Sequence, residues 1–262
     1  MSTNAGMNIS SQGKCELMQF SQLSSLPANV SDRLRTLCRL RTHKSNERVM
    51  VVGERSSSIG LVADGMLRME KTALDGRHHI VGLLVEGDIF GRVFGGPAEY
   101  AIEAATDATV VYFPRAQFES LLSESHELER VVMLNLLNEL DRARDWMLIV
   151  SSPKIRTRLA GFLMMLCTRF GNIDHILVAS GGRLSLNIPI TRADLASLLG
   201  TRAESISRAF HTLADAGTIS IKQPNLIDIL DIERLGEEAG EDFLESGPSL
   251  TALLRAVRRK AG

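Results

Sequence analysis

The chain has 262 residues, which is long enough for two domains that each bury a core of their own. Its formal net charge at pH 7 is −1, so a globally basic nucleic-acid-binding protein is excluded. No apolar run approaches the roughly 18 residues that a membrane-spanning helix needs, so no membrane span is expected.

Residues 1–27 are polar and aperiodic, and we expect them to form a mobile N-terminal segment. Met1–Ser10 lacks the basic start and the apolar core of a signal peptide, which predicts a cytoplasmic protein. The cysteines are Cys15, Cys38 and Cys167, and no two of them form a C-x-x-C pair. Neither a disulfide framework nor a zinc site is therefore expected.

Residues 28–122 are predicted to form an antiparallel β-roll. From about Val49 to Phe113 the sequence consists of short β-rich runs that are separated by turn signals. Asp64-Gly65 and Asp75-Gly76 are dipeptides typical of tight hairpins, and further glycines punctuate the runs that follow. This pattern is typical of an antiparallel sandwich or roll.

Residues 123–151 are predicted to form one long helix. Its apolar residues repeat with steps of three and four, which is the heptad spacing of a two-helix contact. The residues that flank this stripe are charged, so the stripe is narrow. We therefore expect a homodimer formed through this helix; packing of the stripe on the chain's own β-roll is the alternative. The predicted seam consists of Met133, Leu136, Leu140, Ala143, Met147 and Val150.

Residues 152–235 are predicted to form a DNA-binding domain, which begins after the helix-breaking Ser151-Ser152-Pro153. The first stretch of this domain carries basic residues and no acid, which suits contact with phosphates; a solvated charged face is the alternative. The basic residues are Lys154, Arg156, Arg158 and Arg169.

Two short helices follow in the spacing of a helix-turn-helix. Thr191 and Thr201 each stand three residues before an acid, which is the capping-box spacing that begins a helix. Gly200 is predicted to end the first helix and Gly217 the second, because glycine is the usual residue just after a helix.

The second of these helices is predicted to have two distinct faces. Its apolar residues fall at i, i+3, i+4 and i+7 and form a core-facing stripe. The stripe consists of Ile206, Ala209, Phe210 and Leu213. The other face carries a methyl group, a carboxylate, a hydroxyl and a guanidinium, which together can read base edges in a major groove. These residues are Ala203, Glu204, Ser207 and Arg208. Each alone could be a cap, a backbone contact or a solvated charge, but their grouping favours DNA binding.

After this helix, Thr218–Ile221 and Leu226–Ile229 alternate in polarity and flank the polar turn Lys222–Asn225, which predicts a wing. Residues 236–262 form a C-terminal extension that begins acidic. The apolar stripe between Leu250 and Val257 predicts a short amphipathic helix that docks on the body of the protein.

The segment Glu204-Ser205-Ile206-Ser207-Arg208 resembles the E-x-x-S-R recognition motif in the FNR branch of the CRP/FNR family of bacterial transcription regulators. The resemblance extends from about Cys15 to about Glu238. It implies an α+β fold with an N-terminal β-roll of the cyclic-nucleotide-binding type, a long dimerisation helix and a C-terminal winged helix-turn-helix. It also implies that Arg208 contacts a guanine, Glu204 a cytosine amino group and Ser207 a thymine, which agrees with their donor and acceptor chemistry.

The resemblance further implies that a homodimer binds a TTGAT-N4-ATCAA-like palindrome, with its recognition helices in successive major grooves about 34 Å apart. Double-stranded DNA, a second copy of the chain and RNA polymerase are the implied partners. The implied target genes serve microaerobic, anaerobic or nitrogen-oxide metabolism. Polar residues beside the reading face are expected to contact phosphates. They are Thr191, Arg192, Thr201, Arg202, Ser205 and His211.

Oxygen-sensing members of this family hold an iron-sulfur cluster on four cysteines. At the corresponding positions this chain has Cys15, Met18, Ser24 and Val111, so a single thiolate remains. A thioether and an aliphatic side chain are poor cluster ligands, and a standard cluster is therefore not expected.

Two other ligands of this family have weaker support in the sequence. Cyclic-nucleotide-binding members hold the phosphate with an Arg-Ser pair, whereas Arg92 of this chain lacks both the serine and the acidic residue for the ribose. Haem, which nitric-oxide-sensing relatives carry, is the alternative to a regulator without a cofactor. Its candidate axial ligands are His43, His78, His79, His126 and His175.

No catalytic signature predicts an enzyme. Ser151-x-x-Lys154 lacks the companion motifs of a serine nucleophile, and the chain has no P-loop, no dinucleotide-binding glycine motif and no H-E-x-x-H. The alternative from a different class is a β-roll protein that binds a small ligand and whose helical pair is incidental.

Overall fold

The structure, a computed structural model, describes residues 23–72, 78–169, 176–180, 183–188 and 190–240. Within these ranges the chain divides into two compact units. The first unit comprises residues up to 69 together with 83–136, and the second comprises 70–82 together with residues from 137 onward. Helix α3 (His126–Ser151) begins in the first unit and ends in the second.

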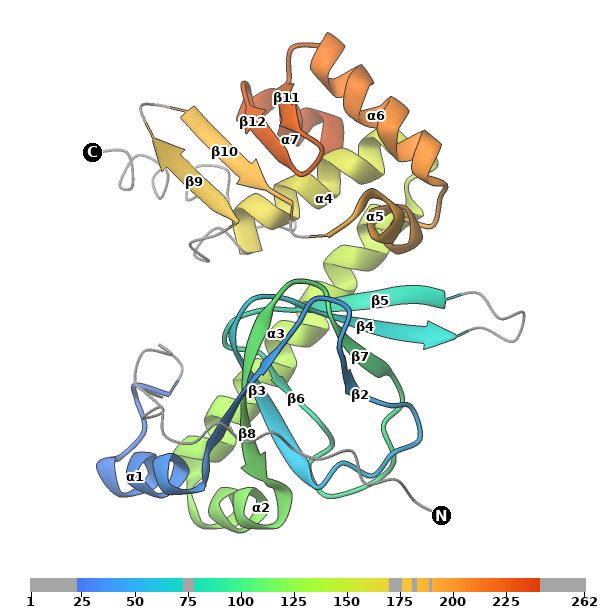
Figure 1. The fold of residues 1–262 in the computed structure, drawn as a ribbon. Coiled ribbons are helices and arrows are strands. Elements are labelled where there is room, and N and C mark those ends of the chain that lie inside the picture. The colour runs from blue at the N-terminus through green and yellow to red at the C-terminus, as the bar shows by residue number, and fades with distance from the viewer. Residues whose placement is uncertain (1–22, 73–77, 170–175, 181–182, 189, 241–262) are drawn as a thin grey trace. The chain divides into compact units, whose positions relative to one another are not determined.

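The N-terminal part of the chain forms a β-roll from two sheets (Figure 1). Within the described residues each sheet has four strands, in the orders β1-β8-β3-β6 and β2-β7-β4-β5. The first sheet is antiparallel throughout. The strands are β1 (Arg39–His43), β2 (Arg48–Met50), β3 (Ser58–Asp64), β4 (Leu67–Thr72), β5 (His78–Leu84), β6 (Ile89–Phe90), β7 (Ala101–Ala104) and β8 (Ala108–Pro114).

The turn at Asp64-Gly65 joins strands of different sheets, so the predicted hairpin at this position is wrong. Strand β3 pairs with β8 and β6, whereas β4 lies between β7 and β5. Gly65 has a φ of +80°, and a Cβ atom there would lie 2.3 Å from the carbonyl oxygen of Asp107. A left-handed corner needs the same residues as a hairpin turn, which explains the error. The second predicted hairpin dipeptide, Asp75-Gly76, lies outside the described residues.

Strand β8 supplies side chains to two cores, because successive residues of a strand point to opposite faces. Val110 lies in the core between the sheets, together with Phe90. Val111 and Phe113 lie in a second core, where helices cover the other face of the sheet. The helices that contribute to it are α1 (Ala28–Leu37), α2 (Arg115–Glu124) and the beginning of α3.

A break at Ser125 separates α2 from α3. The Ser125 hydroxyl accepts a hydrogen bond of 3.2 Å from the backbone N–H of Leu128, so it caps the following helix. The long helix predicted over residues 123–151 therefore begins at His126 and ends at Ser151.

The C-terminal unit packs helices around a small sheet of order β11-β12-β10-β9. Helix α4 packs against α6 and α7, and α5 packs against α6. The predicted fold, with a β-roll, a long helix and a winged helix-turn-helix, is confirmed. The elements are α4 (Ile155–Arg169), β9 (Leu177–Ser180), β10 (Arg183–Asn187), α5 (Arg192–Leu198), α6 (Ala203–Asp215), β11 (Ile219–Gln223), β12 (Leu226–Ile229) and α7 (Ile232–Ala239).

Several elements of this unit were not predicted from the sequence. Strands β9 and β10 extend the wing hairpin to a larger sheet. Helix α7 crosses residue 235, where the DNA-binding domain was expected to end; Asp231 caps it by accepting a hydrogen bond from the N–H of Arg234. The stripe expected between Leu250 and Val257 lies outside the described residues.

Candidate nucleic-acid interface

Helix α5 begins at the predicted cap. The Thr191 hydroxyl oxygen accepts a hydrogen bond of 3.1 Å from the backbone N–H of Asp194, and the same hydroxyl donates to the Asp194 carboxylate at 2.8 Å. Leu195 and Leu198 are buried, so this short helix is held by its cap and by an apolar face.

In the turn between the two helices, Thr201 does not have the capping role that was predicted for it. Its backbone N–H donates to the carbonyl oxygen of Ala196, and the N–H of Gly200 donates to that of Ser197. With Gly200 at a φ of +64°, this is a Schellman motif that closes α5. Thr201 therefore belongs to the end of the first helix, and Arg202, whose side chain makes no capping bond, precedes the second. The predicted cap at Thr201 is wrong.

Helix α6 ends in the same way. The N–H of Gly217 donates to the carbonyl oxygen of Ala214, and the N–H of Thr218 donates to that of Leu213. Gly217 has a φ of +75°, which the left-handed residue of a Schellman motif requires. The prediction that Gly200 and Gly217 end the two helices is confirmed.

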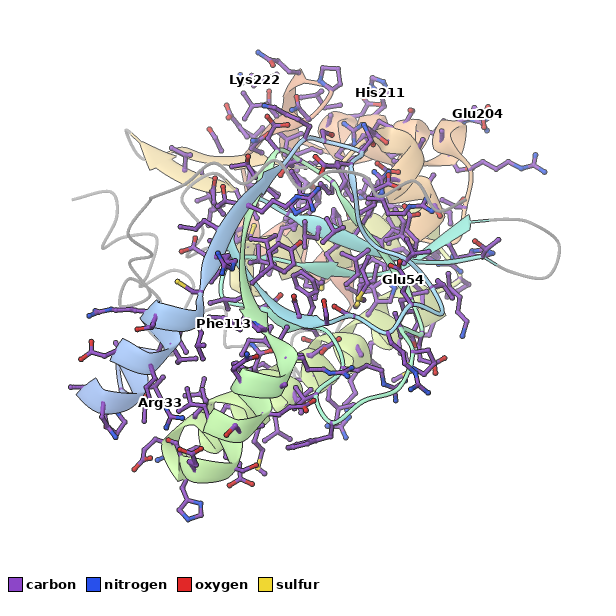
Figure 2. The ribbon with its side chains drawn as sticks, turned by 60° about the horizontal axis from the view of Figure 1, so that its bottom comes forward. Arg33, Glu54, Phe113, Glu204, His211 and Lys222 are labelled. Carbon is purple, nitrogen blue, oxygen red and sulfur yellow. The ribbon has the colours of Figure 1, made fainter. Side chains whose placement is uncertain are left out.

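The two faces predicted for α6 are present. The apolar stripe of Ile206, Ala209, Phe210 and Leu213 is buried. Ala203, Glu204, Ser207 and Arg208 are exposed. The side chains of Glu204, Ser207 and Arg208 have no hydrogen-bond partner among the described residues. Figure 2 shows Glu204 and His211 on α6 and Lys222 on the wing along one edge of this unit.

The residues expected to contact phosphates divide into two groups. Thr191, Arg202 and His211 are exposed, and their positions leave them accessible to a ligand. Arg192, Thr201 and Ser205 are partly buried.

Arg192 has a different environment from the other basic residues of the motif. Its guanidinium carbon lies 3.3 Å from the centre of the Phe210 ring, which is a cation–π contact between α5 and α6. Its Nη1 atom is buried and has no hydrogen-bond partner within the described part of the chain. Burial lowers the pKa of Arg192 to about 10. The side chain thus packs the two helices together in this structure.

The wing is the antiparallel hairpin β11–β12, as predicted. Lys222 is exposed near its tip, with its Nζ atom 3.4 Å from the Asp228 carboxylate. Asp228 also accepts a hydrogen bond of 2.7 Å from the Ser185 hydroxyl of β10, so the carboxylate is held in place. Lys222 was not among the residues predicted from the sequence to contact DNA, although a lysine beside the polar turn of a wing is a signal for phosphate contact.

The basic residues at the start of α4 have internal partners. Arg156 forms an ion pair with Glu238 of α7. Arg158 donates from Nε to the carbonyl oxygen of Ser152 at 2.7 Å and from Nη1 to that of Leu199 at 2.8 Å. Lys154 is exposed, and the side chain of Arg169 lies outside the description. Much of the positive charge read from the sequence is therefore used within the unit.

The exposed side of α3 is apolar along most of its length. Met133, Leu136, Leu140, Ala143 and Met147 of the predicted seam are exposed, and Val150 is partly buried. The exposed fractions of Met133, Leu136 and Met147 reach 56%, 59% and 60%. The face is wider than predicted, because Leu134, Leu137 and Leu148 are exposed as well.

Polar side chains inside the β-roll have partners of their own. His43 is buried, with Nδ1 3.0 Å from a Glu47 carboxylate oxygen and Nε2 2.9 Å from the Tyr112 hydroxyl. Both ring nitrogens are thus engaged, which leaves neither for a metal. Of the other candidate haem ligands, His79 and His126 are exposed, and the side chains of His78 and His175 lie outside the description.

Of the residues at the expected cofactor positions, Ser24, Val111 and Arg92 lie within the described residues. Val111 is 1% exposed in the apolar core and cannot ligate iron, and Ser24 is an exposed turn residue. Cys15 and Met18 lie outside the described residues. Arg92 donates to the carbonyl oxygen of Pro97 and to the Glu99 carboxylate, so its guanidinium already has an anionic partner.

Comparisons with known proteins cover both parts of the chain. Residues 40–125 match the model of the cyclic nucleotide-binding domain, and residues 157–238 match the model of the Crp-like helix-turn-helix domain. The chain is 30% identical over 215 residues to the transcriptional activator protein FnrL of Cereibacter sphaeroides, which covers 81% of this chain and 86% of FnrL. It is 29% identical to the nitrogen fixation regulation protein FixK of Bradyrhizobium diazoefficiens, over 84% of this chain and 90% of FixK.

Solved structures agree with these matches. The structure of FixK2 from Bradyrhizobium japonicum has a TM-score of 0.67 and 25% identity, and it covers 76% of this chain and 96% of FixK2. A CRP-family regulator of Thermus thermophilus, TTHB099, has a TM-score of 0.63 at 22% identity, over 77% of this chain and 97% of TTHB099, and supports the fold. Among the described residues, no helix is both long and apolar enough to cross a membrane.

Proposed function

This chain belongs to the CRP/FNR family of transcription regulators, and from that premise we propose that it binds, as a homodimer, a palindrome of the form TTGAT-N4-ATCAA. It is a DNA-binding regulator rather than an enzyme, and it is similar to activators such as FnrL. The alternative of a β-roll protein that only binds a small ligand is excluded, because the match includes the Crp-like helix-turn-helix domain.

The observation that carries the proposal is the exposed face of α6. The Arg208 guanidinium can donate two parallel hydrogen bonds to a guanine, and the Glu204 carboxylate can accept one from a cytosine amino group. Ser207 and Ala203 are small enough to approach a thymine, whose methyl group offers an apolar contact. These residues project from a helix whose opposite face is buried, so their positions are fixed by the core.

Exposed polar residues around this face position the protein on the DNA backbone. Arg202 and His211 lie beside the reading residues on α6, and Lys222 lies on the wing. Phosphate contacts of this kind bind all sequences alike and weaken as salt rises. Arg192 differs from these residues, because its guanidinium lies over the Phe210 ring and its Nη1 atom is buried.

The test is a gel shift on the palindrome with Arg208→Ala. Loss of a bidentate guanine contact costs about 1–3 kcal/mol on the specific site and much less on unrelated DNA. Arg202→Ala is the matched control beside the same helix, and it should weaken both duplexes alike while reducing the salt slope by about 1. If Arg208→Ala lowered specific and nonspecific binding equally, Arg208 would not be a base reader.

The homodimer is proposed from the apolar side of α3. Met133, Leu140 and Met147 are exposed in the single chain, and a second copy would cover them in a parallel two-helix contact. The parallel arrangement places both helix-turn-helix motifs at the same end, as a palindrome requires. RNA polymerase is the proposed further partner, by membership of the family.

We propose further that this dimer forms in air without an effector, because the predicted seam contains no ionisable side chain. In oxygen-sensing members of the family a carboxylate at the position of Ala143 makes dimerisation depend on the cluster. Sedimentation of aerobic, metal-free protein at micromolar concentration should give a dimer. Ala143→Asp brings two carboxylates together and should shift it to monomer. A monomeric parent would contradict the proposal.

A regulator without a cofactor is proposed because Val111 and Ser24 cannot supply cluster thiolates and Arg92 is paired with Glu99. Protein made and kept without oxygen should lack stoichiometric iron and acid-labile sulfide. Its absorption spectrum separates the alternatives, since a cluster, a haem and no cofactor give different bands. The proposed targets are genes of microaerobic, anaerobic or nitrogen-oxide metabolism, by similarity to FnrL and FixK.

A further inference from the structure

Arg158 joins three elements of the C-terminal unit. It lies on the first turn of α4, where its Nε donates to the carbonyl oxygen of Ser152 at 2.7 Å. Its Nη1 donates to the carbonyl oxygen of Leu199 at 2.8 Å. Ser152 directly follows the last residue of α3, and Leu199 is the C-cap of α5. One side chain thus spans 47 positions of sequence from the end of the long helix to the turn of the helix-turn-helix.

The chemistry of these contacts favours arginine specifically. The last carbonyl groups of a helix have no partner within it, and the C-terminal end of a helix carries partial negative charge. A guanidinium is always charged and holds its donors in a rigid fork, so it can bond to two such carbonyls at once. The side chain is partly buried, and a Cβ atom at Gly200 would lie 3.6 Å from its Nη1, so the turn passes close to it.

The rest of the junction between α3 and α4 is closely packed. A Cβ atom at Gly161 of α4 would lie 3.1 Å from a side-chain carbon of Ile149, so the two helices approach each other closely there. The rings of Trp146 and Phe162 meet edge to face with centres 6.1 Å apart. These contacts hold α4 against the end of α3, and Arg158 adds the link from that junction to α5.

We infer that Arg158 is a positioning residue that fixes the direction of the recognition helix relative to the end of the long helix, and thereby the half-site spacing that the dimer accepts. The inference rests on the proposed function, because it requires a dimer joined through α3. It gives Arg158 a role without contact to DNA, in contrast to the phosphate contact that the basic sequence of this segment suggested. Both donors named above are already used within the protein.

The experiment measures the affinity of the full chain for palindromes with three, four, five and six base pairs between the half-sites. Each added base pair rotates one half-site by about 34° and moves it by about 3.4 Å. Wild type should prefer the four-base-pair spacer by roughly tenfold or more. Arg158→Gln should lose most of this preference. Its discrimination against a mutated half-site, which depends on Arg208, should stay as in wild type.

Arg158→Lys separates geometry from charge. A lysine keeps the positive charge but cannot hold both carbonyls in one fork, so it should fail to restore the spacing preference. If Arg158 contacted a phosphate instead, lysine would restore binding and glutamine would lower the salt slope by about 1. Arg156→Gln is the matched control on the same helix; it breaks the pair with Glu238 and should leave the spacing preference unchanged.

The outcomes separate the role of Arg158 from the proposed function. Failure of wild type to dimerise or to bind the palindrome would overturn the proposed function. Wild-type binding with an unchanged spacing preference in Arg158→Gln and Arg158→Lys would overturn the role of Arg158 alone. Trp146 fluorescence and thermal unfolding test whether each variant is folded. If Arg158→Gln does not fold, the spacing preference of Arg158→Lys tests the role of Arg158.

Discussion

Polar side chains lie both on the outer face of α6 and inside the β-roll. The two regions differ in whether these side chains have partners within the protein. In the roll, His43 lies between Glu47 and Tyr112, and Arg68 forms an ion pair with Glu103. On α6, Glu204 and Arg208 point into solvent without a partner among the described residues. Leaving a buried polar group unpaired costs free energy, whereas an exposed polar group can exchange water for a ligand.

This difference agrees with the proposal that the exposed face of α6 binds DNA. His43 and Arg68 have partners within the described residues, and the Phe90 ring lies against Gly60, where a Cβ atom would lie 2.2 Å from the ring. The recognition helix, in contrast, presents donors and acceptors whose partners must come from outside. The proposed DNA binding uses only groups on α6 and its surroundings, so we expect it to be independent of an effector.

The largest expected effect comes from deleting one phenylalanine in each unit. Phe210→Ala and Phe113→Ala each remove a buried ring, which costs about 3–5 kcal/mol of unfolding free energy. Phe210→Ala should also abolish DNA binding, because it removes both the core of α6 and the ring beneath Arg192. Phe113→Ala should retain base discrimination at temperatures where it is folded.

Thermal unfolding and gel shifts of both variants check this pair. An equal loss of base discrimination in Phe113→Ala would show that the reading face depends on the roll, and the contrast between the two regions would then fail.

A smaller effect is expected at the contact between the roll and α3. The Asn135 side chain donates to the carbonyl oxygen of Gly87 at 3.0 Å and accepts from the N–H of Ile89 at 3.2 Å. Asn135→Ala leaves two backbone groups without partners, which costs about 1–3 kcal/mol. Asn138→Ala, at an exposed position of the same helix, is the control and should cost little. Urea unfolding of the free protein measures both, and equal values would contradict the assigned contact.

The helix-turn-helix was predictable from sequence because its signals are local. The buried stripe of α6 follows from the helical period, and Gly200 and Gly217 are recognisable as the left-handed residues after each helix. The capping prediction failed at Thr201 because two motifs share the turn, and the Schellman bond of its N–H to Ala196 took precedence.

What the sequence did not reveal depends on contacts between distant residues. Arg192 of α5 lies on the Phe210 ring of α6. A helical wheel relates residues of one helix only, so it does not predict this contact. The bond from Arg158 to Leu199 is equally distant in sequence, and a basic run alone suggested solvent or phosphate. The turn at Asp64-Gly65 also depends on distant contacts. The dipeptide predicts that the chain turns there, but it does not predict whether the two flanking strands pair with each other.

The cap at Thr191 provides a comparison within the DNA-binding unit. Thr191→Ala removes the oxygen that accepts from the N–H of Asp194 and should cost about 1 kcal/mol of unfolding free energy. Thr201→Ala leaves the backbone bonds of the turn intact and should cost less than about 0.5 kcal/mol. Chemical unfolding of the two variants without DNA gives both numbers. If Thr201→Ala lost more unfolding free energy than Thr191→Ala, Thr201 would cap α6 after all, against the geometry described above.

The smallest expected effect is the pH dependence that His43 adds to the roll. Burial lowers the pKa of His43 below its ordinary value of 6.5, with Glu47 acting in the opposite direction. The folded protein therefore binds fewer protons here than the unfolded chain just below pH 6.5, and stability falls as pH falls through this window. The pKa of Glu47 is also lowered, so its contribution is lost only below 4.5.

His43→Gln keeps a hydrogen-bonding side chain and removes the titration. Its unfolding midpoint in urea should change less between pH 7 and pH 5.5 than that of wild type. An identical pH profile for the two proteins would show that His43 is not protonated on unfolding in this range.

The two-sided construction of α6 has a consequence for how such regulators diverge. Substitutions at exposed positions without internal contacts usually change the unfolding free energy by less than about 0.5 kcal/mol. Positions 203, 204, 207 and 208 are of this kind, because the core holds the helix from its other side. Under the proposed base contacts, a lineage can exchange its operator sequence by a few mutations that hardly change the free energy of unfolding. Duplicated copies of such a gene can acquire separate sets of target promoters while keeping one scaffold.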